Sequence, residues 1–177
     1  QIHELREMLR LVYLSAGVLV DDPDCRRDPT WGAVRPGEAA LIGQAAFGEK
    51  VLKALAGAGE ELAVVYMPPD GGKPNPFREA AEALGIPVRQ PARMRDPEVF
   101  EEYKTFGADL NVMAFVTDIV PMTILSHAPL GTIQYHPSLL PRHRGASAIN
   151  WAVINGEPKT GLTIFWPDEG LDTGPIL

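Results

Sequence analysis

Short apolar runs alternate with segments of helical periodicity along the chain after residue 38. Four apolar runs predict strands, at residues 39–42, 62–66, 86–89 and 109–114. Three segments between them have the apolar spacing of helices, at residues 47–56, 77–84 and 97–106. This order predicts a doubly wound α/β fold, with a mostly parallel sheet, helices on both faces and right-handed crossovers.

Two later strands are predicted to end at polar side chains. His136 directly follows an apolar strand at 132–135, and Asp172 lies in a turn-rich loop, 168–174, that follows a strand at 161–166. A loop at 137–145 and a helix at 146–154 connect the two strands. Ligands of doubly wound sheets bind outside the carboxyl ends of the strands. We therefore expect His136 and Asp172 to face each other across one cleft, each at the carboxyl end of a strand in one parallel sheet.

The first 37 residues have a different character. Residues 2–14 have the apolar spacing of a short amphipathic helix, and residues 21–37 are rich in Asp, Arg, Pro and Gly. We predict an N-terminal extension or linker at 1–37 and a catalytic domain at 38–177. The chain starts at Gln1 rather than Met and stops at Leu177 just after Gly-Pro, so both ends read as cuts. We expect the end of the fold to lie beyond Leu177.

Composition excludes several classes of function. A net charge of −7 disfavours a surface that neutralises nucleic-acid phosphates. The single cysteine, Cys25, cannot form an internal disulfide, and the sequence has no Cys/His cluster that would bind zinc. No apolar run reaches the roughly 18 residues that span a bilayer. We predict a cytoplasmic protein without a metal site or a membrane segment.

A glycine-containing turn, from Gly43 to Gly48, follows the first predicted strand. Position 45 is alanine, whereas the dinucleotide fingerprint G-x-G-x-x-G needs glycine there so that a pyrophosphate can approach the backbone. The sequence also lacks a G-x-x-x-x-G-K-[ST] loop. We interpret this turn as packing a helix against the sheet, and we expect neither NAD nor ATP in this domain.

His136 is the first candidate for chemistry. A lone histidine at a strand end is most simply structural, with its ring held by a backbone carbonyl. His136, however, precedes an apolar loop bracketed by prolines, which comprises Ser138, Leu139, Leu140 and Pro141. Three basic side chains follow directly, Arg142, His143 and Arg144. A rigid apolar wall beside basic groups suits a flat aromatic ligand with an anionic tail. Arg144 is the better candidate for a substrate contact. For Arg142 and His143, a solvated surface charge is the alternative.

Asp172 is the second candidate, and it could also be an ordinary turn residue. A carboxylate beside an imidazole supports acid/base chemistry. Asp168 and Glu169 in the same loop could compete for this role. Trp151 and Trp166 could stack on a ligand, but core or interface packing explains them better.

The segment from Tyr135 to Gly145, YHPSLLPRHRG, together with Gly170-Leu171-Asp172-Thr173-Gly174, resembles the signature of the folate-dependent formyltransferase superfamily. Within that superfamily the chain looks most like the hydrolase domain of 10-formyltetrahydrofolate dehydrogenase. Methionyl-tRNA formyltransferase is a relative whose sequence usually differs in the segments that carry this likeness. The segments that carry this closer likeness are Gly43-Gln44 with Phe47-Gly48, Leu110-Asn111-Val112, residues 146–151 and Ile164-Phe165-Trp166.

The resemblance implies a Rossmann-like formyltransferase fold and 10-formyltetrahydrofolate as the one-carbon donor. It implies that His136 stabilises the oxyanion at the formyl carbon, while Asp172 orients the histidine and a water. The pterin would meet backbone groups of a loop that maps to Asp118, Ile119 and Val120, and Ser138 to Pro141 would border the cleft.

One residue departs from the common family pattern. Asn-x-His is usual, whereas this chain has Gln134-Tyr135-His136, and glutamine is one methylene longer than asparagine. Gln134 is therefore a possible secondary catalytic contact, or a sign of a catalytically impaired folate-binding module. The formyl acceptor stays open among water, a carrier thiol, an amine and methionyl-tRNA, and further domains could lie downstream.

Overall fold

The computed structural model describes residues 38–177. The predicted helix at 2–14, the linker at 21–37, the domain boundary near residue 37 and Cys25 lie outside the described residues. Among residues 38–177, no helix is long and apolar enough to cross a membrane.

Six strands form one sheet in the order β3-β2-β1-β4-β5-β6. The strands are β1 (Ala39–Gly43), β2 (Leu62–Tyr66), β3 (Val88–Arg89), β4 (Leu110–Ala114), β5 (Thr132–His136) and β6 (Thr163–Phe165). All neighbouring strands from β3 to β5 pair in parallel, and β6 pairs with β5 in the antiparallel sense. The predicted α/β fold with a mostly parallel sheet is confirmed.

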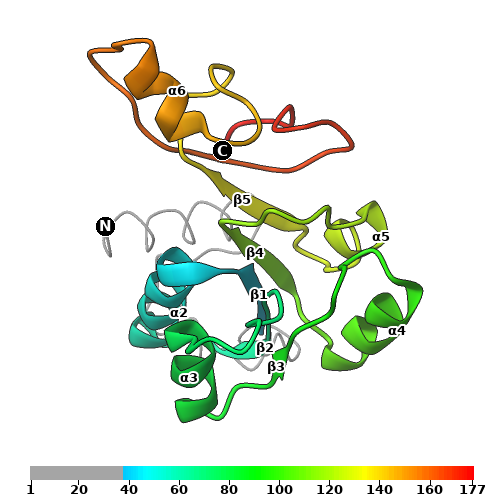
Figure 1. Cartoon of the computed structure of the whole chain (residues 1–177). Helices are drawn as coiled ribbons and strands as arrows, with labels where there is room; N and C mark the ends of the chain where they lie inside the picture. The colour runs from blue at the N-terminus through cyan, green and yellow to red at the C-terminus, as the bar shows by residue number, and fades with distance from the viewer. Residues whose placement is uncertain (1–37) are drawn as a thin grey trace, which may run out of the picture.

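Helices cover both faces of this sheet. They are α2 (Ala45–Ala58), α3 (Pro76–Ala83), α4 (Pro97–Phe106) and α5 (Met122–Leu125). A further helix, α6 (Ala148–Ile154), lies beyond the end of β5 (Figure 1). Figure 1 shows α2 and α3 on one side of the strands and α4 and α5 on the other, with α6 above the end of β5. Each side encloses its own apolar core: Leu52 and Phe77 belong to the first, and Ile124 and Tyr103 to the second.

Most predicted elements are present with shifted ends. The helix expected at 47–56 extends over Ala45–Ala58, and the strand expected at 86–89 shortens to Val88–Arg89. The four-residue helix α5 was not predicted. Its backbone is held from the sheet, because Asn111 of β4 donates to the carbonyl of Ile124 and Thr132 of β5 donates to that of Leu125. Such long-range contacts leave no periodic signal in a segment of this length.

The direction of β6 contradicts the reason we expected His136 and Asp172 to meet. His136 pairs with Thr163 and Gln134 with Phe165, so β6 runs away from the edge at which β5 ends. The chain then turns back, since Trp166 N–H donates to the carbonyl of Pro175 and Leu177 N–H to that of Ile164. The returning loop of this hairpin carries Asp172 to His136. Strand polarity therefore does not bring the pair together, although the two residues do meet.

The turn after β1 packs a helix against the sheet, as predicted. A Cβ atom on Gly43 would lie 2.8 Å from the carbonyl oxygen of Ala114, and one on Gly48 would lie 2.8 Å from the ring of Phe77. Glycine at both positions lets α2 approach the sheet and α3 closely.

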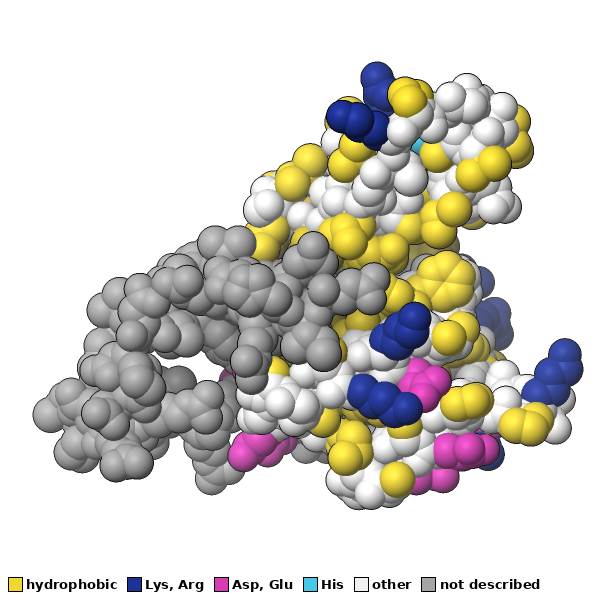
Figure 2. All heavy atoms as spheres, turned by 90° about the vertical axis from the view of Figure 1, so that its left-hand side faces the viewer, with side chains coloured by type: hydrophobic (Ala, Val, Ile, Leu, Met, Phe, Trp, Pro, Cys, Tyr) yellow, Lys and Arg dark blue, Asp and Glu magenta, His cyan; other side chains and the backbone are white. Residues whose placement is uncertain are grey.

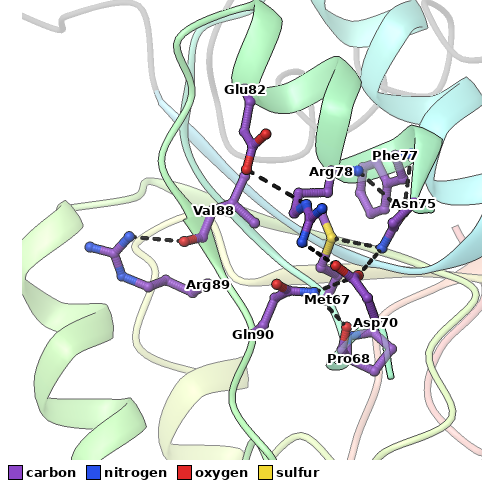
Figure 3. Close-up of polar contacts among 10 residues, drawn as sticks. All are labelled: Met67, Pro68, Asp70, Asn75, Phe77, Arg78, Glu82, Val88, Arg89 and Gln90. Atoms are coloured by element: carbon purple, nitrogen blue, oxygen red, sulfur yellow. Dashed lines mark hydrogen bonds and ion pairs between the residues drawn. The ribbon is translucent and has the colours of Figure 1, made fainter. Parts of the chain in front are cut away.

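A network centred on Asp70 orders the loop between β2 and α3 (Figure 3). The Asp70 carboxylate accepts hydrogen bonds from Asn75 Nδ2 at 2.6 Å and from Gln90 Nε2 at 2.7 Å, and it pairs with Arg78. The Oδ1 atom of Asn75 caps α3 by accepting from the backbone N–H groups of Phe77 and Arg78. One carboxylate thus holds together the chain after β2, the start of α3 and the end of β3.

Replacing Asp70 with asparagine is expected to remove a pH-dependent part of the stability. The hydrogen bond from Asn75 lowers the pKa of Asp70 below its ordinary value, and Gln90 and Arg78 lower the pKa further against the opposing effect of burial. The pKa is lower in the folded state, so the stabilisation is present above the unfolded pKa of about 4 and is lost as pH falls through the folded value. Urea unfolding should show wild type more stable than Asp70→Asn at pH 7, with a gap that narrows below pH ~4. Asp96→Asn, at an Asp96–Arg93 ion pair within one turn, is the control; a gap for Asp70→Asn that does not change with pH would contradict the assignment.

The part of the chain around α6 exposes many apolar side chains. Figure 2 shows them across the upper part of the molecule, with basic side chains at its tip. The large exposed apolar residues here are Leu139, Ile149, Trp151, Val153, Ile154, Leu162, Leu171 and Ile176. Trp151 is 51% exposed, so it does not pack in the core, because α6 covers no face of the sheet. Interface packing of Trp151 stays a prediction. Trp166 does pack against the apolar core on the α2 side.

Candidate active site

His136 and Asp172 form a buried pair beyond the end of β5. His136 Nδ1 lies 3.2 Å from Asp172 Oδ2, and the two residues are 5% and 8% exposed. Side chains alternate along a strand, so His136 and Gln134 share one face of β5, while Tyr135 packs on Phe47 of α2 on the other. The apolar strand thus delivers an imidazole to a position where a carboxylate from a distant loop reaches it.

The Asp172 carboxylate has two further donors. Oδ2 accepts from the backbone N–H of Gly145 at 2.7 Å, and Oδ1 accepts from Gln134 Nε2 at 3.4 Å. Asp172 itself has a φ of 51°, a left-handed conformation that a residue with a side chain adopts at a cost in free energy. The three contacts hold its carboxylate in this position. Gln134 is therefore part of the cluster, and its amide is directed at Asp172.

The other ring nitrogen of His136 faces a backbone carbonyl. Nε2 lies 2.7 Å from the oxygen of His143, in the loop that follows β5. The two interpretations of His136, a side chain held by a carbonyl and one half of an acid/base pair, are thus both present in the geometry. The pair is nearly enclosed, because His143 covers one edge of the imidazole and Gly145 contacts the carboxylate.

Asp168 and Glu169 do not take the place of Asp172. Asp168 Oδ1 accepts from the Thr173 hydroxyl at 2.6 Å and from the Gly170 N–H at 2.9 Å, and these bonds stabilise the turn itself. The bond from Thr173 is the main cause that lowers the pKa of Asp168, and the charge of Arg144 lowers it slightly. Glu169 is exposed. Arg144 is also exposed, and it lies close enough to Asp168 for its positive charge to act on that carboxylate.

Part of the apolar loop after His136 is braced from inside. The Ser138 hydroxyl donates to the carbonyl of Arg142 at 2.6 Å, and the Ser138 carbonyl accepts from Thr163 Oγ1 at 2.7 Å. Ser138 is fully buried, so its side chain supports the loop. Leu139 and Pro141 are exposed and Leu140 is half-buried, and they form the apolar rim beside the pair.

The predicted pterin loop follows β4, the parallel neighbour of β5, and so begins at the same edge of the sheet as His136. The Asp118 carboxylate accepts from the backbone N–H groups of Met94 and Ile119, at 2.7 and 2.8 Å. Ile119 is exposed, whereas the Val120 side chain is buried in the core on the α4 side. Asp118 thus orders the loop, and its carboxylate is already engaged by two backbone N–H groups.

A small pocket lies along the same edge, beyond β1 and β2. It is lined mainly by residues 42–44, 66–68, 91–94 and 116–118. Asp118 borders it, while His136 and Asp172 do not line it. Within residues 38–177, no group of three or more His, Cys, Asp and Glu side chains could hold a metal ion.

Two partners of the pair, and one partner of the neighbouring His143, were missed in the sequence. They are the backbone N–H of Gly145, the carbonyl of His143 and the side chain of Glu157, which lies 2.7 Å from His143 Nε2. Backbone N–H and C=O groups occur at nearly every residue, so the sequence does not mark the ones that bind. Glu157 looks like an ordinary polar residue after the end of α6. The basic run at 142–144 and the proline-bracketed apolar segment before it pointed to this loop, but not to these contacts.

Comparison with known proteins identifies the family of this chain. The family model described as formyl transferase matches residues 39–177. Mitochondrial 10-formyltetrahydrofolate dehydrogenase from Mus musculus is 49% identical over 144 residues, which cover 78% of this chain and 16% of the mouse protein. Methionyl-tRNA formyltransferase from Syntrophus aciditrophicus is 43% identical over 144 residues, covering 77% of this chain and 46% of that protein.

The fold of solved structures agrees as well. Phosphoribosylglycinamide formyltransferase from Bacillus halodurans superposes with a TM-score of 0.67 at 28% identity, covering 78% of this chain and 76% of that one. This chain thus spans about a sixth of the length of the mouse dehydrogenase that it matches. The family match covers every residue of the site described above, and we conclude that the chain belongs to the formyl transferase family.

Proposed function

We propose that this chain is the catalytic domain of an enzyme that removes the formyl group from 10-formyltetrahydrofolate. The buried His136–Asp172 pair carries this proposal, since the two side chains are 3.2 Å apart and come from segments 36 residues apart in the sequence. An imidazole held against a carboxylate supplies the acid/base group that acyl transfer needs. Membership of the formyl transferase family names the group to be transferred.

His136 acts on the charge that develops at the formyl group. When a nucleophile adds to the formyl carbon, the carbonyl oxygen becomes an oxyanion, and a preorganised N–H donor stabilises that charge. Collapse of the adduct breaks the bond to N10 of the folate. His136 is placed to donate the proton that the leaving nitrogen requires.

Asp172 orients the imidazole and accepts the proton that the nucleophile loses. With water as the nucleophile the products are formate and tetrahydrofolate. The hydrogen bonds from Gly145 and Gln134 keep the carboxylate directed at the site. Gln134 thus acts through Asp172, as a positioning residue.

The folate lies across the carboxyl edge of the sheet. Backbone groups of Asp118, Ile119 and Val120 meet the pterin, which is in keeping with an Asp118 side chain already engaged by two amides. Leu139, Leu140 and Pro141 border the ligand, Ser138 braces that loop, and Arg144 contacts an anionic part of a substrate.

The relatives differ in the acceptor of the formyl group that their names imply. The mouse relative is named a 10-formyltetrahydrofolate dehydrogenase and the Syntrophus relative a methionyl-tRNA formyltransferase. We favour water or a carrier thiol, because the higher identity is to the dehydrogenase. Transfer to an amine or to methionyl-tRNA is the alternative, and a cytoplasmic location remains a prediction.

A catalytically impaired folate-binding module is the second candidate. The observation that favours it is the direction of the Gln134 amide, which donates to Asp172. Among the contacts of the described residues, no side-chain donor other than His136 is then available for the oxyanion. Such a module would bind folate with normal affinity and release no formate.

Formate release decides between these functions. The full-length protein is incubated with 10-formyltetrahydrofolate, with and without initiator methionyl-tRNA, and formate, tetrahydrofolate and formylated tRNA are measured. Formate without tRNA supports hydrolysis, and label on the tRNA supports transfer. Folate binding without either product identifies the impaired module, and absence of both binding and turnover would refute the proposal.

A further inference from the structure

Both ring nitrogens of His136 face hydrogen-bond acceptors. Nδ1 is 3.2 Å from the Asp172 carboxylate and Nε2 is 2.7 Å from the backbone carbonyl of His143. A carbonyl oxygen can only accept, whereas a carboxylate can accept as the anion or donate once it is protonated. The two sides of the ring are therefore chemically unequal.

This inequality determines which nitrogen can exchange a proton. The contact of 2.7 Å between Nε2 and the His143 carbonyl is a hydrogen bond only while Nε2 carries its hydrogen, in the neutral ring as in the cation. The proton that comes and goes is then the one at Nδ1, on the side shared with Asp172. The partner of one imidazole nitrogen selects the tautomer in this way in many histidine sites.

The carbonyl of His143 needs a support to stay in place. His143 has a φ of 52°, in the left-handed region that is unfavourable for a residue with a side chain. Its side chain reaches past the end of α6, where Nε2 lies 2.7 Å from Glu157 Oε1, with both side chains mostly buried at 14% and 20% exposure. Glu157 is itself fixed, because its N–H donates to the carbonyl of Ala152 in α6.

We infer that His143 and Glu157 are positioning residues for His136: their hydrogen bond holds the His143 carbonyl on Nε2, which reserves Nδ1 for the proton exchanged during formyl transfer. The kinetic part of this inference rests on the proposed function. The structural part, the fixed tautomer, does not. In the reaction, Nδ1–H donates to the oxyanion and then gives its proton to the departing folate nitrogen. Asp172 takes the proton of the nucleophile and returns it to Nδ1, and Nε2–H stays on the carbonyl throughout.

Glu157→Ala tests the support directly. We expect kcat to fall by about tenfold, as is usual when the outer partner of a site residue is lost. The KM for 10-formyltetrahydrofolate should be unchanged, because Glu157 bonds to His143 and Ala152, which lie outside the proposed folate loops. Glu157→Gln keeps an oxygen that accepts from His143 and should recover most of the turnover. His143→Ala should reproduce Glu157→Ala, and the double variant should be no worse than either, because all remove the same bond.

A second readout follows the ring itself. In the protein labelled with ¹⁵N-histidine, which has four histidines, the His136 signals are assigned with a His136→Gln variant. Under conditions where the ring is neutral, wild type and Glu157→Gln should show a protonated Nε2, and Glu157→Ala a mixture of both tautomers. Glu101→Ala, which breaks the exposed Glu101–Lys104 pair on α4, is the matched control and should change neither readout.

The outcomes separate the inference from the proposed function. An unchanged tautomer and unchanged kcat in Glu157→Ala, in a protein that turns over folate, would overturn the inference and leave the function standing. If wild type shows no turnover but the tautomer is fixed in wild type and mixed in Glu157→Ala, the function fails and the positioning role stands. A lower kcat that Glu157→Gln does not recover would assign Glu157 to charge and not to the hydrogen bond, and would also overturn the inference.

Discussion

Replacing His136 with alanine is expected to lower kcat for cleavage of 10-formyltetrahydrofolate by about a hundredfold or more, because the reaction loses its acid/base group and an oxyanion donor together. The KM for folate should change little, since the proposed pterin contacts come from the loop after β4. Initial rates of formate release measure both constants.

His127→Ala is the matched control for this loss. His127 is an exposed histidine that packs edge-on against Phe100 and Tyr103 on the α4 side of the molecule, away from the pair. It should leave kcat close to that of wild type. Retained turnover in His136→Ala, with folate still bound, would show that another residue is the catalytic acid.

Replacing Asp172 with asparagine should have the second largest effect, and it should affect both activity and stability. The carboxylate accepts from Gly145 N–H and Gln134 Nε2 and faces His136 Nδ1. Asparagine has one acceptor oxygen, and its amide donors would face groups that also donate. We expect kcat to fall by about a hundredfold and the free energy of unfolding to fall by about 1–3 kcal/mol, since one donor loses its partner.

Asp168→Asn separates the charge of this loop from the role of Asp172. Asp168 is an exposed carboxylate four residues away, and its hydrogen bonds to Thr173 and Gly170 stay within the turn. The Asp168 variant should retain turnover. Steady-state kinetics and urea unfolding of the two variants give the comparison, and equal losses of kcat would show that Asp172 has no special role.

The sheet could be predicted because each buried strand leaves a local apolar run. The strands at Leu62–Tyr66 and Leu110–Ala114 lie in the middle of the sheet, so nearly every residue in them is buried and the run is continuous. Strands at the edge of the sheet are harder to predict from sequence. Only two residues of β3 pair with β2, and the rest of the apolar segment predicted there lies outside the strand.

The candidate site could be located from sequence only in part. His136 follows its strand directly, so a correct strand was enough to place it. The choice of Asp172 over Asp168 could not be made from spacing, because both lie in one short turn. It depends on a hairpin that turns back after β6, and on the left-handed backbone at Asp172 that directs the carboxylate at the ring.

Local periodicity and motif spacing were enough to predict an α/β sheet, a histidine at the end of β5 and a family resemblance. These features depend only on residues that are close in sequence, since a buried strand is visible as a run of apolar residues and its end as the first polar residue after that run. Only the tertiary structure decided that β6 is antiparallel, that Gln134 contacts Asp172 and that Glu157 holds His143. These contacts join segments up to 38 residues apart, and their geometry follows from how loops pack rather than from any pattern along the chain.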